Sequence, residues 1–308
     1  MMKVLYSPMN CLLCGSAKLK PCYQPPTLFN SKYFYYYQCA PCGTINVYPL
    51  PDRKDLEKMY NYQDYHLVYY TNNNNRKNSR DSCLSTFLKY TPGGRVLDYG
   101  CGTGEFLDTL YKSRFETYGY EPNSEIANKL NCHKHKMIYD ADIVNGKYEY
   151  YFDIIYLGDV LEHLVTPYAV MKNLLGLLKS TGYLYIEGPL ENNFTLALLT
   201  IKFLKSLQKK IIPTITSVHP PYHITMMTYN GFVSFVKRLH LEILEENVCE
   251  KDWPWPIDFS HLTIEKFIKS TFAYSSKMVR DSIFGKYMKW GNRIQMLARK
   301  NYYTQRHK

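Results

Sequence analysis

The sequence predicts an α/β fold built around a mostly parallel β-sheet, preceded by a small cysteine-rich module. From about residue 91, short apolar runs alternate with segments of helical pattern, and such alternation is typical of βαβ units. Residues 1–50 instead carry cysteines and prolines between short apolar runs, which favours a loop-rich module. The 308 residues, 45% of them apolar, are enough to bury one large core and such an appendage.

Seven apolar runs are the expected strands of the sheet: "RVLDYG", "TYGYEP", "MIYDADI", "FDIIYLGD", "GYLYIEGP", "LEILEENV" and "RIQMLARK". Segments with a helical pattern, such as "NSEIANKLNCHK" and "TPYAVMKNLLGLLKSTG", separate them. We expect the sheet domain to span residues 91–302, followed by a basic tail at 303–308. An insertion at 190–230 is expected to cover the binding site, with an amphipathic helix in "FTLALLTIKFLKSLQKKII".

Residues 51–90 are predicted to form a helical linker or cap between the two parts. The segment "DRKDLEKMYNYQDYHLVYY", residues 52–70, resembles a short helix with a tyrosine-rich continuation. The asparagine-rich run "TNNNNRKN" at 71–78 is predicted to be a loop that marks the module boundary.

The chain carries a formal charge of +11, and between Lys277 and Lys308 nine basic residues face a single acid, Asp281. This asymmetry indicates an anionic partner, whether nucleotide, phosphate or nucleic acid, or else a solvated basic tail. No run of 18 uncharged apolar residues and no signal-peptide pattern is present. We therefore expect a cytoplasmic protein with no membrane span.

Two C-x-x-C pairs, "CLLCG" at 11–15 and "CAPCG" at 39–43, define the N-terminal module. A glycine after each pair lets backbone N–H groups face thiolate sulfurs, as in tetrahedral zinc sites. A redox site would need only one such pair at the start of a helix. The pattern predicts a structural zinc ion with these ligands: Cys11, Cys14, Cys39 and Cys42.

The stretch "VLDYGCGTGEFL", residues 96–107, places three alternating glycines directly after a strand-like run that ends in Asp98. Glycines there let the backbone approach a ligand and point helix N-terminal N–H groups at it. The G-x-G-x-G spacing of Gly100, Gly102 and Gly104 differs from dinucleotide turns and from a P-loop, and no lysine for phosphates follows. Glu121, 23 residues after Asp98, would place a carboxylate beside a ribose.

From about residue 94 to residue 300 the chain resembles the class I S-adenosylmethionine-dependent methyltransferases. The motifs that carry the resemblance are "VLDYGCGTGEFL", "GYEPNSEIA", "DADI", "FDIIYLGDVLEHLVTPYAVMKNLL", "KSTGYLYIEGP" and "GNRIQMLARK". The resemblance implies a Rossmann-like, seven-stranded, mostly parallel sheet and S-adenosylmethionine as cofactor. The N-terminal module is then zinc-ribbon-like.

The resemblance also implies where the cofactor lies. Asp98 and the three glycines would hold its methionine part, and Glu121 would bind the ribose diol. Asp142 and Ile143 would bracket the adenine, with Asp140 as the alternative to Asp142. The residues after the fourth strand would face the sulfonium and the acceptor: Leu157, Gly158 and Asp159.

The cysteine pairs, the segment "YPLPDRKDLEKMYNYQDYH" and the core motifs together resemble bacterial-type sugar methyltransferases of deoxysugar and surface-glycan pathways. Some of these methylate carbon and carry a "YHEHFSYFS"-like segment where this chain has "HPPYHITMMT", residues 219–228. This departure favours methylation of oxygen. The motif "PPY" lies too far beyond the fourth strand to indicate amino methylation, and no Pro-Cys follows that strand for cytosine-C5 chemistry.

Methylation of a hydroxyl requires removal of its proton, for which a histidine is suited. His163, His223 and His219 are the candidates, although each can instead have a purely structural role. Two functions remain open: methylation of a sugar hydroxyl on a nucleotide-linked sugar or glycan, or methylation of RNA bound by the cysteine module and the basic C-terminus. A cofactor-binding partner without catalysis is disfavoured because the glycine turn is intact.

Overall fold

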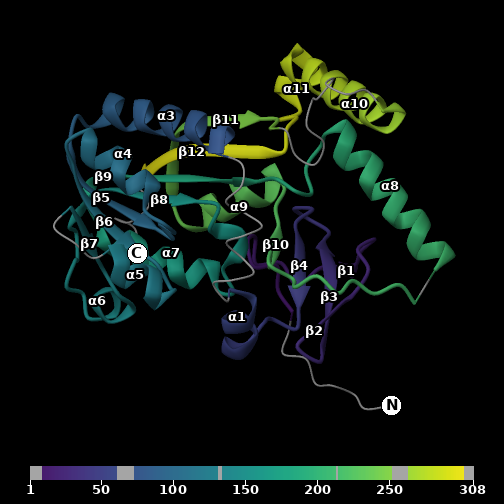
Figure 1. The fold of residues 1–308 in the computed structure, drawn as a ribbon, viewed down its shortest axis with the longest axis horizontal. Helices are drawn as coiled ribbons and strands as arrows, with labels where there is room; N and C mark the ends of the chain where they lie inside the picture. Colours follow the sequence, from purple (N-terminus) through teal and green to yellow (C-terminus); the bar gives the residue numbers. More distant parts are fainter. Residues whose placement is uncertain (1–8, 61–72, 131–133, 213, 252–262, 302–308) are drawn as a thin grey trace.

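The computed structural model describes residues 9–60, 73–130, 134–212, 214–251 and 263–301. It confirms the predicted fold class, with a seven-stranded sheet in the order β11-β12-β9-β8-β5-β6-β7 (Figure 1). The strands are β5 (Gly94–Tyr99), β6 (Phe115–Tyr120), β7 (His135–Met137), β8 (Phe152–Gly158), β9 (Leu178–Pro189), β11 (Leu241–Cys249) and β12 (Arg293–Lys300).

Four neighbouring pairs in this sheet are parallel: β5 with β6, β5 with β8, β6 with β7, and β8 with β9. Strand β12 lies antiparallel between β9 and β11. Parallel strands end at the same edge of a sheet. The turns after β5, β6 and β8 therefore meet at one edge, where the sequence analysis places the cofactor.

Helices cover both faces of the sheet. The helices between its strands are α4 (Glu105–Lys112), α5 (Ser124–Leu130), α6 (Asp140–Val144), α7 (Pro167–Leu177) and α9 (Tyr229–Arg238), with a short 3-10 helix η1 (Leu161–His163). On β5, Val96 packs in a cluster with Phe87 and Phe106, whereas Leu97 packs in the cluster that includes α7 and α9. The alternation of side chains along the strand thus separates two apolar layers.

The N-terminal module forms a second, antiparallel sheet. Its strands are β1 (Leu19–Pro21), β2 (Thr27–Phe29), β3 (Lys32–Cys39) and β4 (Ile45–Tyr48), followed by α1 (Arg53–Met59). Strand β10 (Thr225–Met226), from the far end of the insertion, pairs with Asn46 and Ile45 of β4. The insertion thereby completes the sheet of the N-terminal module.

The asparagine-rich run at 71–78 is not the predicted loop, because residues from Asn73 onward belong to helix α3 (Asn73–Tyr90). Cys83 and Phe87 of this helix are fully buried against the sheet. Burial of these side chains holds the helix in place, and asparagine in the preceding turns costs less than about 1 kcal/mol per residue. The helix therefore extends into the polar segment.

The run "MIYDADI" is also not the single strand that was predicted. Strand β7 ends at Met137, and helix α6 begins at Asp140. The carboxylate of Asp142 accepts a hydrogen bond from the backbone N–H of Tyr139 at 3.1 Å. This cap favours a helical turn over further pairing with β6.

Helix α8 (Leu196–Ile211) lies where the sequence places an amphipathic helix, but it contacts the N-terminal module through its lysines. Lys205 Nζ donates to Gln24 Oε1 at 2.8 Å, and Lys209 Nζ donates to Cys22 O at 2.6 Å. The apolar side chains Leu199, Phe203, Leu207 and Ile211 are exposed. Helix α8 packs beside α10 (Ile264–Asp281), which is followed by α11 (Ile283–Tyr287) (Figure 1).

Among the described residues, none of the helices combines the length and the apolarity that crossing a bilayer requires. The predicted tail, 303–308, lies outside the described residues, as does much of the predicted linker at 61–72.

Candidate active site

The glycine turn after β5 adopts backbone conformations that favour glycine. Gly100, Gly102 and Gly104 have φ angles of 88°, 52° and 79°. A Cβ atom at Gly100 would lie 2.5 Å from Cγ2 of Val160, and one at Gly104 would lie 2.6 Å from Cδ2 of Leu130. The turn is therefore closely packed against the segment after β8, and Gly104 is the N-cap of α4.

Glu121 is tied to this turn. Its Oε2 accepts a hydrogen bond from the N–H of Gly102 and its Oε1 accepts one from the N–H of Asn123, both at 3.0 Å. Burial raises the pKa of Glu121, while the two backbone donors oppose the shift. Asp98 is buried, and this burial raises its pKa to about 8 against the attraction of Arg80. The structure thus brings Asp98, the glycines and Glu121 together, as predicted.

The two acids proposed for the adenine have other partners. Asp140 accepts a hydrogen bond from Tyr120 OH at 2.8 Å, and Asp142 accepts one from Lys147 Nζ at 2.8 Å. Ile143 packs at the edge of the main core cluster. The rings of Tyr99 and Tyr120 stack at a centroid distance of 4.3 Å beside this region. The geometry does not choose between Asp140 and Asp142.

Leu157 and Gly158 are the last two residues of β8 and not part of the turn after it; Leu157 is buried and Gly158 is partly buried. Asp159 follows the strand with a φ of 55°. The carboxylate of Asp159 is paired with Arg293 of β12, with Nη1 to Oδ1 at 2.6 Å and Nη2 to Oδ2 at 3.1 Å. Arg293 also lies 3.3 Å from Oε1 of buried Glu187. Nearby carboxylates hold the pKa of Arg293 well above its usual value despite its burial.

Replacing Arg293 with methionine is expected to lower the free energy of unfolding by about 3–5 kcal/mol, because it leaves the buried carboxylate of Glu187 without its cation. Urea denaturation monitored by circular dichroism measures this change. Arg299→Met, which removes an exposed arginine from the same strand, is the control and is expected to change stability by less than about 1 kcal/mol. Equal effects of the two substitutions would contradict the assignment.

His163 and His223 lie together, with ring centroids 4.7 Å apart. Nδ1 of His163 donates to the carbonyl oxygen of Tyr222 at 2.8 Å, and Tyr60 OH lies 2.9 Å from the same nitrogen. Nδ1 of His223 lies 2.7 Å from Oε2 of Glu191. Two segments distant in the sequence therefore meet beside the turn after β8.

The electrostatics of the two rings differ. Burial, together with His223, lowers the pKa of His163 to about 3. Burial also disfavours the charged form of His223, but the adjacent Glu191 carboxylate raises its pKa to about 9. Burial raises the pKa of Glu162 to about 8, and Asp159 adds to this shift. His219, by contrast, is exposed, and its backbone N–H donates to Ser217 Oγ at 3.2 Å.

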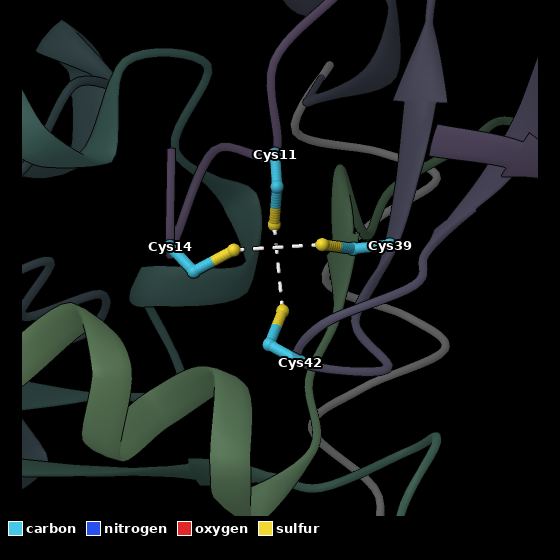
Figure 2. Close-up of side chains that lie close together, drawn as sticks. All are labelled: Cys11, Cys14, Cys39 and Cys42. Carbon is cyan, nitrogen blue, oxygen red and sulfur yellow. Dashed lines mark hydrogen bonds between the residues drawn. The ribbon is translucent and has the colours of Figure 1, made fainter. Parts of the chain in front are cut away.

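The four cysteines of the N-terminal module point toward a common centre (Figure 2). Their Sγ atoms lie within 4.8 Å of one another, with Cys11 and Cys42 3.6 Å apart and Cys14 and Cys39 3.4 Å apart. A tetrahedral ion with Zn–S bonds of ~2.3 Å has sulfurs roughly 3.8 Å apart. The arrangement of the thiols therefore fits a zinc ion.

Each knuckle closes through a backbone hydrogen bond from its glycine, which reaches a carbonyl oxygen and not the predicted thiolate sulfur. Gly15 N–H donates to the carbonyl oxygen of Cys11, and Gly43 N–H donates to that of Cys39. The two glycines have φ angles of 80° and 78°. Asn46 of β4 holds the first knuckle, since its Nδ2 lies 3.7 Å from Cys11 Sγ and its Oδ1 accepts from Leu12 N–H at 2.9 Å.

Sequence reasoning missed several residues of the site. Glu187 and Glu191 lie at the end of β9 and just after it, and a carboxylate at the end of a parallel strand is a signal that could have found them. Arg293 begins the last strand as a partly buried cation. Nothing in the sequence distinguishes Tyr60 from the other tyrosines, because the chain contains 31 of them.

Residues 73–245 match a family model described as a methyltransferase domain. The match spans more than half of the chain, and the chain belongs to this family. With its seven-stranded sheet and its glycine turn after β5, the protein is a class I S-adenosylmethionine-dependent methyltransferase. No curated protein matches the sequence.

Solved structures provide further comparisons. The PH0226 protein from Pyrococcus horikoshii OT3 is 13% identical, with a TM-score of 0.49 over 78% of this chain and 100% of that chain. A SAM-dependent methyltransferase from Archaeoglobus fulgidus is 21% identical, with a TM-score of 0.41 over 81% of this chain and 100% of that chain. The plantazolicin methyltransferase BpumL is 16% identical, with a TM-score of 0.43 over 82% of this chain and 91% of that chain.

Proposed function

We propose that this methyltransferase transfers a methyl group to a hydroxyl of a nucleotide-linked sugar or glycan. The observation that carries the proposal is the partly buried pair of His163 and His223 beside the turn after β8. Methyl transfer from a sulfonium is an in-line displacement that requires an aligned acceptor and exclusion of water. A hydroxyl acceptor also requires removal of its proton, and two adjacent, partly buried imidazoles suit that chemistry.

S-adenosylmethionine is proposed to bind at the edge where β5, β6 and β8 end. Asp98 and the glycine turn hold its methionine part, Glu121 binds the ribose diol, and Ile143 with Asp142 or Asp140 borders the adenine. Leu157, Gly158 and Asp159 face the sulfonium and the acceptor. The close packing of Gly100 against Val160 supports this arrangement, since Val160 lies only three residues before His163 in the sequence.

One histidine is proposed to assist the removal of the hydroxyl proton, from the set His163, His223 and His219. The clustered pair is favoured over His219, because a general base must lie within hydrogen-bond reach of a shielded acceptor and His219 is exposed. Glu191 acts as a positioning residue, since its carboxylate fixes the ring of His223.

An RNA methyltransferase is the alternative function, motivated by the charge of +11. An assay with radiolabelled S-adenosylmethionine distinguishes the two functions. In it, the purified protein is offered nucleotide sugars, glycans and RNA as acceptors. Label in a sugar hydroxyl supports the proposal. Label in RNA alone, with RNA binding that weakens steeply as salt rises, would overturn it.

Cys11, Cys14, Cys39 and Cys42 are proposed to hold one structural zinc ion. A module of this size, residues 1–50, has little core of its own, and a structural zinc ion supplies much of the folding free energy of such modules. The proposed division of the chain keeps residues 51–90 as linker and 91–302 as the methyltransferase domain, with the insertion at 190–230. Because β10 of the insertion pairs with β4 of the N-terminal module, the insertion is also proposed to support the zinc module.

Cys14→Ser is expected to lose the zinc ion and to lower turnover by about tenfold or more, because misplacement of a supporting segment disturbs acceptor alignment. Affinity for S-adenosylmethionine is expected to stay the same, since the glycine turn lies in the other sheet. Elemental analysis, calorimetry and a turnover assay give the three measurements. Cys249→Ser, which changes a cysteine outside the cluster, is the control. Zinc-free wild-type protein purified without chelator would refute the assignment.

A further inference from the structure

A second group of metal-ligand side chains lies beside the turn after β8. One ligand atom each from Glu162, His163 and His223 lies within 4.8 Å of the other two. Glu162 and His163 belong to η1, whereas His223 lies two residues before β10. The fold therefore brings one carboxylate and two imidazoles to a single point from segments about sixty residues apart in sequence.

One oxygen of the Glu162 carboxylate, Oε2, has no hydrogen-bond partner among the residues that the structure describes. The Glu162 side chain is 1% exposed. A buried polar atom is normally paired with a donor, an ordered water or an ion, and leaving it without one costs about 1–3 kcal/mol or more. The other oxygen, Oε1, lies 3.9 Å from Nε2 of His163. A cation between these groups would satisfy the carboxylate.

The two histidines are oriented as metal ligands are. Nδ1 of His163 donates to a backbone carbonyl, and Nδ1 of His223 pairs with the carboxylate of Glu191. Metal-binding histidines typically use one ring nitrogen in such an outer hydrogen bond, which fixes the tautomer and directs the other nitrogen to the metal. With the proton on Nδ1, the lone pair of a neutral ring lies on Nε2. The ring of His223, which Glu191 favours in its charged form, would release its Nε2 proton as the ion binds.

We propose that Glu162, His163 and His223 bind one divalent transition-metal ion, which holds the acceptor through two neighbouring oxygens. The second half of this inference rests on the proposed sugar acceptor. One carboxylate and two imidazoles suit Mn²⁺, Fe²⁺ or Co²⁺ and leave coordination positions open for other oxygens. A vicinal pair of sugar hydroxyls offers two such oxygens.

The bound ion changes how the histidines serve the reaction. A hydroxyl on a divalent cation is more acidic than one in water, and it loses its proton to solvent water. The oxygen then forms a bond to the methyl carbon while the carbon–sulfur bond breaks, and its electron pair stays on sulfur as the neutral thioether. In this state the two imidazoles hold the ion, and neither takes the proton.

Titration of the full chain with Mn²⁺, followed by calorimetry and electron paramagnetic resonance, tests the site. Mn²⁺ prefers oxygen and nitrogen ligands and does not replace zinc on four thiolates. One Mn²⁺ ion per chain is expected. Glu162→Gln and His223→Gln are each expected to weaken Mn²⁺ binding by at least about tenfold, with unchanged affinity for S-adenosylmethionine. His240→Asn, at an exposed histidine with a φ of 54°, is the control and is expected to bind Mn²⁺ normally.

Absence of saturable Mn²⁺ binding, or unchanged binding in both folded variants, would overturn the inference. If chelated protein without this site still methylates a nucleotide sugar at full rate, the inference fails and the proposed function stands. If Mn²⁺ binds as expected but no sugar or glycan is methylated, the metal site is supported and the proposed acceptor fails. Circular dichroism of each variant separates loss of binding from loss of folding.

Discussion

Gly102→Val is expected to weaken binding of S-adenosylmethionine by at least about a hundredfold, or about 2.7 kcal/mol. Gly102 has a φ of 52°, where a β-branched residue is strained. Its N–H also donates to Glu121, so a displaced backbone would release the carboxylate that is proposed to bind the ribose. The new side chain would, in addition, occupy space proposed for the methionine part of the cofactor. Isothermal titration calorimetry with S-adenosylhomocysteine measures the loss.

Gly146→Val is the matched control for this substitution. Gly146 has a φ of 68°, and no atom lies within 4 Å of a Cβ built there. The control therefore imposes similar backbone strain in open space, away from the glycine turn. Comparable losses of affinity in the two variants would show that strain alone is responsible and would contradict the placement of the cofactor.

His163→Ala and His223→Ala are expected to lower turnover by about 10²–10⁴-fold, the range that proton removal by a positioned side chain contributes. Affinity for S-adenosylmethionine should change little, because the histidines are proposed to serve the acceptor. Each variant is assayed separately at saturating cofactor, with His219→Ala as the third member of the set and His240→Asn as the control. A loss in kcat at constant cofactor affinity identifies a role in the reaction itself.

Near-normal turnover in all three alanine variants would refute the role of the histidines. Alignment of the acceptor alone would then have to carry the reaction, as it can for a displacement with so good a leaving group. Mn²⁺ added back during the assay separates the two roles of the pair. If turnover of the wild-type protein depends on Mn²⁺, the two histidines act as metal ligands. If turnover does not depend on the metal, one of the histidines acts as a general base.

The strands and the cofactor edge could be predicted because their signals are local. The run "RVLDYG" contains the consecutive apolar residues typical of a strand that is buried on both faces, and it ends at Gly100, the first glycine of the turn. The four cysteines were equally predictable, since short spacing within each pair fixes the geometry of a knuckle. Helix α3 was missed because its asparagines carry no helical pattern, and only burial of Cys83 and Phe87 reveals why it forms.

The acceptor side of the site could be predicted only in part. The sequence indicates His163 and His223 as candidates, since one follows the fourth strand and the other lies in the insertion. It does not predict their contact, because no spacing rule applies to residues about sixty positions apart. The pairing of Arg293 with Asp159 joins residues 134 positions apart. Glu191 is recognised as part of the site only from its 2.7 Å contact with His223. Such contacts arise from tertiary packing, which single-sequence patterns do not encode.

Strand β10 lies about 180 residues after its partner β4, and it begins two residues after His223. Contacts between segments so far apart close a long loop and form late in folding, because the entropy of closure is lost before the contact is gained. The N-terminal module and the methyltransferase core are therefore expected to be in place before the segment with His223 takes its position. The protein would acquire its ability to bind the cofactor before its ability to use it.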